Sequence, residues 1–169
     1  LRYLMYYSGN DGGTMRIGLA MSFDGIIWTK YSGNPILSAS GWEGWWVTGP
    51  SVIFDGSTYK MWYTGYDGSH QRIGYATSSD GTTWMKHDSP VLDIGSVGEW
   101  DSLYVSHCSV IYYGSSYHMW YGGGNYTGPD HSRIGHATSI DGINWQKDPN
   151  NPVIDLGLDG TWDDWSINQ

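Results

Sequence analysis

Short runs of alternating apolar and polar residues, separated by turn signals, cover the whole chain. In its middle part, an apolar run ends at Asp55-Gly56, and two alternating runs follow before a second turn at Asp80-Gly81. A period of two indicates β-strands, and Asp-Gly favours a tight hairpin because glycine accepts positive φ angles. The predicted strands of this part cover residues 50–54, 59–64, 72–78 and 82–86.

The same pattern occurs three times, at intervals of about 60 residues. The markers recur in one order: Met-aromatic-Tyr at Met5, Met61 and Met119; Arg-Ile-Gly at Arg16, Arg72 and Arg133; Asp-Gly at Asp24, Asp80 and Asp141, each with a Trp four residues on at Trp28, Trp84 and Trp145; and Trp-acid at Trp42, Trp100 and Trp162. Units of four antiparallel strands at this length are typical of propeller blades. We therefore predict an all-β fold, a β-propeller with repeat units of about 1–48, 49–106 and 107–169.

Most repeated residues are expected to have structural roles, because a feature found in every unit suits a scaffold. The Asp-Gly pairs supply hairpin turns. Trp84 and its counterparts are expected to wedge between adjacent blades. Arg72 and its counterparts are expected to pair with a neighbouring acid or to stack on a Trp.

The first and last residues lie at different points of the repeat. Leu1 falls in the second strand of its blade, since Tyr3 matches Tyr59, and Gln169 falls where the innermost strand of a further blade would begin. About three blades do not close a ring. Either missing chain or homo-oligomerisation is expected to complete it and to cover the strand edges.

The composition narrows the set of partners. The chain has 11 Trp and 14 Tyr among 169 residues, and its formal net charge is −9. That charge disfavours nucleic acid, whereas exposed aromatic rings suit neutral sugars, whose C–H faces stack on them. No apolar run of about 18 residues occurs, so no membrane partner is expected. Cys108 is the only cysteine, which excludes an intrachain disulfide.

The motifs Gly-Pro-Ser-Val-Ile-Phe-Asp-Gly, Met-Trp-Tyr-Thr-Gly and Arg-Ile-Gly-Tyr-Ala-Thr-Ser-Ser-Asp-Gly-Thr-Thr-Trp, between Gly49 and Trp84, resemble repeats of the furanosidase-type five-bladed propellers. This superfamily includes glycoside hydrolase families 43, 32 and 130. The resemblance implies a carbohydrate partner and a secreted or periplasmic location. It also implies carboxylates at the inner ends of the innermost strands, where one is base or nucleophile and one is general acid.

The positions that match those inner ends are Gly49, His107 and Gln169, and none is acidic. The nearest acids on the same approach segments are Glu43, Asp101 and Asp163. They remain weak catalytic candidates, because they follow the repeated Trp and can instead cap a turn or pair with an Arg. This part of the chain is therefore expected to show weak hydrolysis or none.

Ligand-binding candidates precede or begin each innermost strand. Trp45, Trp46, Tyr104 and Trp165 are candidates for sugar stacking, with inter-blade packing as the alternative. His107 differs from its counterpart Gly49, so it is a candidate for a hydrogen bond to a sugar. It is also a weak metal candidate, because some family 43 enzymes hold a cation on the axis through a His; otherwise no cofactor is expected.

Three functions remain open from the sequence. The first is a glycoside hydrolase or phosphorylase that acts on a neutral polysaccharide or oligosaccharide. The second is a non-catalytic, lectin-like propeller that keeps the aromatic rim without the acids. The third is a self-assembling propeller with no ligand. Fold resemblance alone does not separate them.

Overall fold

The structure is a computed structural model that describes residues 2–125 and 131–167. Within these residues the only helix is the short 3-10 helix η1 (Gly41–Glu43). The strands are β1 (Tyr3–Asn10), β2 (Met15–Ser22), β3 (Thr29–Lys30), β4 (Trp46–Phe54), β5 (Tyr59–Tyr66), β6 (Gln71–Ser78), β7 (Met85–Lys86), β8 (Tyr104–Tyr113), β9 (Ser116–Gly124), β10 (Arg133–Ser139) and β11 (Gln146–Lys147). The all-β prediction is confirmed.

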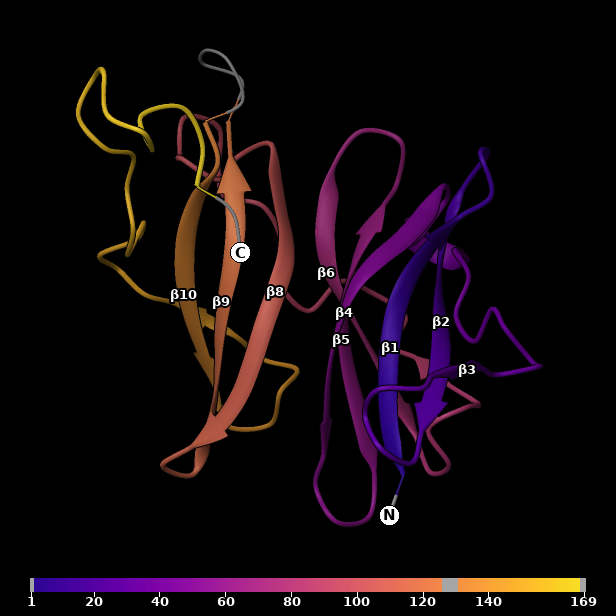
Figure 1. The fold of residues 1–169 in the computed structure, drawn as a ribbon. Coiled ribbons are helices and arrows are strands. Elements are labelled where there is room, and N and C mark those ends of the chain that lie inside the picture. The colour runs from indigo at the N-terminus through magenta and orange to yellow at the C-terminus, as the bar shows by residue number, and fades with distance from the viewer. Residues whose placement is uncertain (1, 126–130, 168–169) are drawn as a thin grey trace.

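The strands form three antiparallel units that we call sheet 1 (β1–β3), sheet 2 (β4–β7) and sheet 3 (β8–β11). A single parallel bridge between Gln71 and Tyr104 joins sheets 2 and 3 at one end. Figure 1 shows sheet 3 on one side of the molecule and sheets 1 and 2 on the other, with β4 and β8 toward the middle. This arrangement is consistent with a β-propeller-like fold, while the number of blades and the closure of the ring stay predictions.

The last strand of sheet 2 is shorter than the sequence predicted. Residues 82–86 were expected to be extended, but β7 covers only Met85–Lys86. The cause is the Asp80 carboxylate, whose Oδ1 accepts the backbone N–H groups of Thr82 and Thr83, both at 2.7 Å. This loop consumes backbone donors that a longer strand would need. Gly81 takes the positive φ of 75° that the turn requires.

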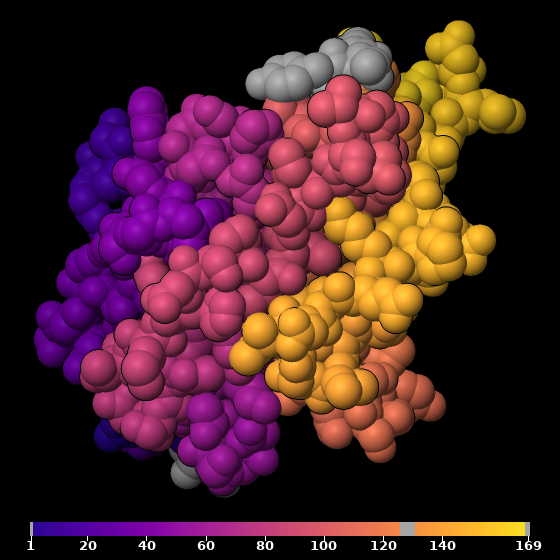
Figure 2. Space-filling model, turned by 180° about the vertical axis from the view of Figure 1, so that it is seen from behind, coloured from indigo at the N-terminus to yellow at the C-terminus, as the bar shows by residue number. Residues whose placement is uncertain are grey.

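Two apolar clusters hold the sheets together. One lies between sheets 1 and 2 and includes Ile17, Val47 and Met61, and the other lies between sheets 2 and 3 around Trp62 and Met119. The space-filling view shows the three units in continuous contact, with the N-terminal and C-terminal parts on opposite sides (Figure 2). Burial of this apolar area is the main stabilising contribution to the fold.

Aromatic side chains reach from one sheet to the Asp-Gly turn of the next. Tyr6 donates its hydroxyl to the Gly81 carbonyl at 3.1 Å, and the Trp62 indole donates to the Gly142 carbonyl at 2.7 Å. Tyr6 also meets the Trp84 ring edge-on at 5.6 Å. Trp84 therefore packs between sheets, as the repeat pattern predicted.

The repeated arginines pair with acids, as expected. Arg72 forms ion pairs with Asp67 and Asp93, and Arg133 pairs with Asp155 at 2.6 Å. The burial of Cys108 raises the pKa of its thiol to about 12, so the thiol stays protonated at neutral pH. In the part of the chain that the structure describes, no helix is long and apolar enough to span a membrane.

Candidate functional site

Matching β-bulges interrupt the innermost strands of sheets 2 and 3. The pairing of β4 with β5 shifts between Thr48 and Ser51, and that of β8 with β9 shifts between Ser106 and Ser109. Gly49 and His107 lie at these bulges with left-handed φ angles of 58° and 45°. β4 begins at Trp46, four residues before the predicted start at residue 50, and β8 begins at Tyr104, three residues before His107, because Trp46 and Tyr104 already pair with β5 and β9.

The two bulges lie next to each other in space. A Cβ atom added to Gly49 would lie 3.3 Å from the His107 Cδ2 atom. A non-glycine residue in this region of φ carries a strain of about 1–3 kcal/mol, and such strain gathers at functional sites. His is among the residues that adopt it most readily. His107 is an exposed side chain on a β-bulge, where bulges commonly re-aim a residue.

Hydroxyl groups from the neighbouring sheet fix each bulge. The Ser8 hydroxyl accepts the Gly49 N–H at 2.9 Å and the Thr48 hydroxyl at 2.8 Å. The Thr64 hydroxyl accepts the His107 N–H at 2.8 Å. Sequence analysis missed this role, although Ser8 and Thr64 occupy the same repeat position and could have signalled it.

The aromatic candidates of sheet 2 form one group at the start of β4. Trp46 stacks on Tyr66 with ring centroids 4.9 Å apart, and Trp45 meets the same Tyr66 edge-on at 6.1 Å. Trp45 is 66% exposed, so most of its ring faces solvent. The group offers one exposed ring supported by two others.

The other two aromatic candidates lie on sheet 3 and beyond it. Tyr104 is half-buried, and its ring lies against Gly124 on β9. Trp165 is 61% exposed and meets His131 edge-on at 5.6 Å. Trp45 and Trp165 share a repeat position, and both side chains are exposed. Gln169 lies outside the described residues.

The carboxylates of Glu43 and Asp101 are buried, and each forms an ion pair. The Glu43 carboxylate accepts the Tyr63 hydroxyl at 2.5 Å and the Lys86 ammonium at 2.8 Å. Asp101 accepts Lys147 at 2.6 Å, and Tyr121 donates to it at 3.2 Å. The partner is thus Lys rather than the Arg that the sequence suggested. The lysines recur two residues after the repeated Trp, a signal that sequence analysis overlooked.

These contacts also affect the tyrosines. Burial raises the pKa of Tyr63 far above its usual value, and the adjacent Glu43 charge raises it further. Tyr63 is therefore a permanent hydrogen-bond donor. Asp163 differs from Glu43 and Asp101, because it forms no ion pair with a described residue. It is half-buried and accepts the Thr161 hydroxyl at 2.9 Å. Among the described residues, no group of three His, Cys, Asp or Glu side chains could hold a metal ion.

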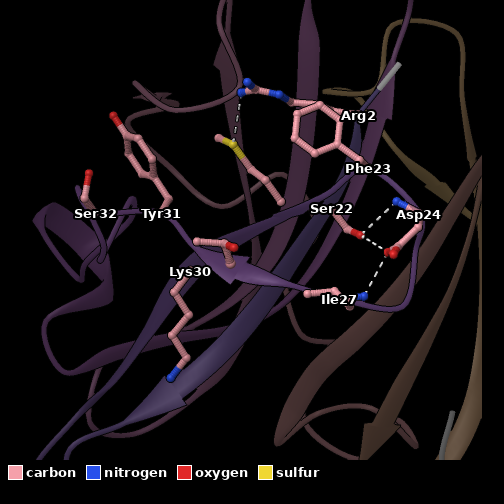
Figure 3. Close-up of a pocket in the computed structure, with 10 residues that line it drawn as sticks. Arg2, Ser22, Phe23, Asp24, Ile27, Lys30, Tyr31 and Ser32 are labelled. Atoms are coloured by element: carbon pink, nitrogen blue, oxygen red, sulfur yellow. Dashed lines mark hydrogen bonds between the residues drawn. The ribbon is translucent and has the colours of Figure 1, made fainter.

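Two cavities, which sequence analysis did not predict, are lined by residues of sheet 1 and of the loops next to its strands. The larger, of about 610 Å³, is lined by Phe23, Ile27 and Tyr31 among others, and the Arg2 guanidinium lies 5.0 Å from the Phe23 ring centroid (Figure 3). The second, of about 380 Å³, is lined by Tyr7, Gly9 and Lys30 among others. Neither includes the bulge residues.

The fold and the repeats define a member of the propeller glycoside hydrolase superfamily. Residues 1–111 match the sequence pattern of glycoside hydrolase family 130, which is described as beta-1,4-mannooligosaccharide phosphorylase. The match covers more than half of the 169 residues, so the chain belongs to family 130.

A sequence relative and two solved structures are also similar to this chain. An uncharacterised protein of Mycobacterium tuberculosis strain CDC 1551 is 33% identical over 174 residues, which cover 95% of this chain and 55% of the relative. The chain thus spans about half the length of the curated relatives that it matches. A family 117 glycoside hydrolase of the marine bacterium Zobellia galactanivorans shares the fold with a TM-score of 0.76 and 20% identity, over 93% of this chain and 54% of that one. A thermostable family 43 glycoside hydrolase gives a TM-score of 0.74 and 22% identity, over 94% and 54%.

Proposed function

We propose that this chain forms part of the sugar-binding funnel of a family 130 propeller and binds neutral β-1,4-linked mannooligosaccharides there. The observation that carries the proposal is the pair of adjacent bulges at Gly49 and His107, with an exposed aromatic group at the start of the same strand. Trp46 lies three residues before Gly49, about 10 Å along β4, a span that a short oligosaccharide bridges.

The exposed Trp45 ring and the His107 imidazole both suit a neutral sugar. The Trp45 ring can stack on the apolar face of a pyranose, and the His107 imidazole can exchange hydrogen bonds with hydroxyl groups. The net charge of −9 disfavours an anionic ligand. We propose the linkage and the sugar from the description of the matched family, which names β-1,4-mannooligosaccharides.

Chemical turnover requires a carboxylic acid that reaches the glycosidic oxygen. The carboxylates of Glu43 and Asp101 form ion pairs with lysines. The residues at the bulges of β4 and β8 are Gly49 and His107, and neither is an acid. We therefore propose that this chain contributes binding rather than a complete acid–base pair. A non-catalytic, lectin-like role is the second candidate, and these same ion pairs favour it.

The test is a titration of the chain with mannobiose and mannotriose, followed by Trp fluorescence. We expect saturable binding that Trp45→Ala weakens about tenfold, equivalent to about 1.4 kcal/mol, because the stacking ring is lost. His107→Gly keeps the left-handed backbone and removes only the imidazole, so it isolates the hydrogen bonds. Val97→Ala, in an exposed turn outside the two bulges, is the control.

Three results would contradict the proposal. Unchanged affinity in both Trp45→Ala and His107→Gly would place the site elsewhere. Robust phosphorolysis or hydrolysis of mannooligosaccharide that Asp101→Asn abolishes, in a variant that still folds, would show that the buried acid is catalytic. Equal affinity for cellooligosaccharides would refute mannose as the preferred sugar.

A further inference from the structure

The backbone of Trp45 is held by two different sheets. Its N–H donates to the Tyr66 carbonyl on β5 at 3.1 Å. Its carbonyl accepts the hydroxyl of Thr14, which directly precedes β2 in sheet 1, at 2.7 Å. Both hydrogen bonds restrict the backbone of Trp45, and the backbone in turn decides which side-chain rotamers are allowed.

The turn between β1 and β2 holds Thr14 in place. The Asp11 Oδ1 atom accepts the N–H groups of Gly13 and Thr14, both at 3.0 Å. The Arg16 guanidinium pairs with the other oxygen of Asp11 at 2.5 Å. These contacts fix the turn from which the Thr14 hydroxyl reaches sheet 2. Figure 1 shows this turn at the same end of the molecule as the turn between β5 and β6.

The Trp45 ring lies on the turn between β5 and β6. A methyl group on Gly68 would lie 2.9 Å from the Trp45 Nε1 atom, so only glycine leaves room for the indole. Tyr66 fixes this turn, because its hydroxyl donates to the Gly68 carbonyl at 2.7 Å. The ring is therefore supported along one edge, while most of its surface faces solvent.

The chain contains a nearly identical turn that supports no ring. Asp55-Gly56-Ser57 precedes β5, and Asp67-Gly68-Ser69 follows it. In both turns the Asp Oδ1 atom accepts two backbone N–H groups, and the glycines adopt φ angles of 99° and 102°. A methyl group on Gly56 would meet no atom within 4 Å. Both turns need glycine for their backbone, but only Gly68 also makes room for an aromatic ring.

The contact made by Thr14 recurs in sheet 3. His131, like Thr14, lies two residues before the arginine of Arg-Ile-Gly. Its Nδ1 atom donates to the carbonyl of Trp165 at 2.9 Å, and Trp165 has the same repeat position as Trp45. Two different side chains thus reach the same backbone carbonyl. The contact is therefore a recurring way of holding an exposed Trp, rather than a property of threonine alone.

We propose that Thr14 and Gly68 are positioning residues, which hold the Trp45 ring in the orientation that stacks on a sugar. This inference rests on the sugar-binding role proposed above for Trp45. Both residues act through the indole: Thr14 restricts its backbone, and Gly68 supports its edge. A ring that is already ordered loses less conformational freedom on binding, so the affinity depends on both residues.

The first test compares Thr14→Val with Thr14→Ser in the titration with mannotriose. Valine keeps the shape of the side chain and removes the hydroxyl, whereas serine keeps the hydroxyl. We expect Thr14→Val to weaken binding about threefold, the cost of immobilising one further side chain, and Thr14→Ser to restore the affinity. In a Trp45→Ala background, Thr14→Val is expected to change nothing, because it acts through the ring. Thr58→Val, at the opposite end of β5, is the matched control.

The second test needs no sugar. The complete chain is labelled with fluorotryptophan, and the fluorine NMR resonance of Trp45 is identified by its loss in Trp45→Phe. We expect this resonance to shift or broaden in Thr14→Val and in Gly68→Ala, but not in Thr14→Ser or Gly56→Ala. Gly56→Ala introduces the same backbone strain at a turn without a ring, so it separates strain from displacement of the indole.

The two tests separate this inference from the proposed function. If mannotriose does not bind the wild-type chain, the sugar-binding function fails, and the fluorine spectra still decide whether Thr14 and Gly68 orient Trp45. A Trp45 resonance that stays unchanged in both Thr14→Val and Gly68→Ala would overturn the inference, whatever the affinity. An equal loss of affinity from Thr14→Val with and without the Trp45 ring would overturn it as well, and so would a Thr14→Ser chain that binds as weakly as Thr14→Val.

Discussion

The buried ion pair of sheet 2 allows a quantitative test of how the repeats are held together. Lys86 is largely buried and pairs with Glu43, which is fully buried. Lys86→Met keeps most of the apolar stem of the side chain and removes the charge. The Glu43 carboxylate then retains only the Tyr63 hydroxyl, at 2.5 Å, and the Ser40 N–H, at 3.1 Å.

Breaking a buried pair by removing one partner costs about 3–5 kcal/mol, because the other charge stays desolvated. We expect the low end, about 3 kcal/mol, because two donors to Glu43 remain. For a domain of this size, that loss lowers Tm by roughly 6–12 °C. Glu43→Leu combined with Lys86→Met removes both charges and is expected to recover part of the loss.

Thermal unfolding followed by circular dichroism measures the change. Lys30→Met is the matched control: it occupies the same repeat position, and no described carboxylate pairs with it, so its effect is expected within about 0.5 kcal/mol. If Lys86→Met is as mild as Lys30→Met, the Glu43–Lys86 ion pair does not hold the sheet together, and the reasoning is wrong.

Two further predictions follow from the same structure. Burial works to raise the pKa of Asp67, but the His70 N–H and Arg72 lower it to about 2. Its contribution to stability is therefore full above the unfolded pKa of about 3.9 and lost as the pH falls toward 2; the Tm difference between wild type and Asp67→Asn should shrink over that range, and a constant difference would contradict the shift. His107→Gly should raise the free energy of unfolding by about 1 kcal/mol, since glycine accepts φ = 45° without strain; a clear loss of stability in urea unfolding would show that the imidazole is structural.

The repeat predicted the all-β fold well because the repeated residues make the contacts that form and join the sheets. The turn at Asp80-Gly81 and the inter-sheet place of Trp84 follow from local chemistry that recurs in each unit. The short last strands did not follow, because an Asp side chain competes with the strand for backbone N–H groups. Such competition depends on a side-chain rotamer, which alternation of apolar residues does not report.

The candidate site was harder to predict, because spacing does not tell what a charge touches. Glu43 looked like a possible catalytic acid by its position, yet its environment is set by Lys86, more than 40 residues later in the chain. The role of Ser8 and Thr64 depends on which backbone N–H groups face them across a sheet boundary. The bulge that makes those N–H groups available leaves no sign in the hydrophobic pattern.

Gly49 and His107 show how the difference between repeats supports the proposed ligand site. Both adopt left-handed backbone at the same bulge, and both donate their N–H to a hydroxyl of the preceding sheet. Glycine does this without strain, so the bulge itself does not require His. The imidazole is therefore retained at a conformational cost, at an exposed point where two innermost strands meet. The imidazole Nδ1 lies 3.2 Å from the Ser106 hydroxyl, so a ligand contact of this side chain stays a proposal, which the His107→Gly titration tests.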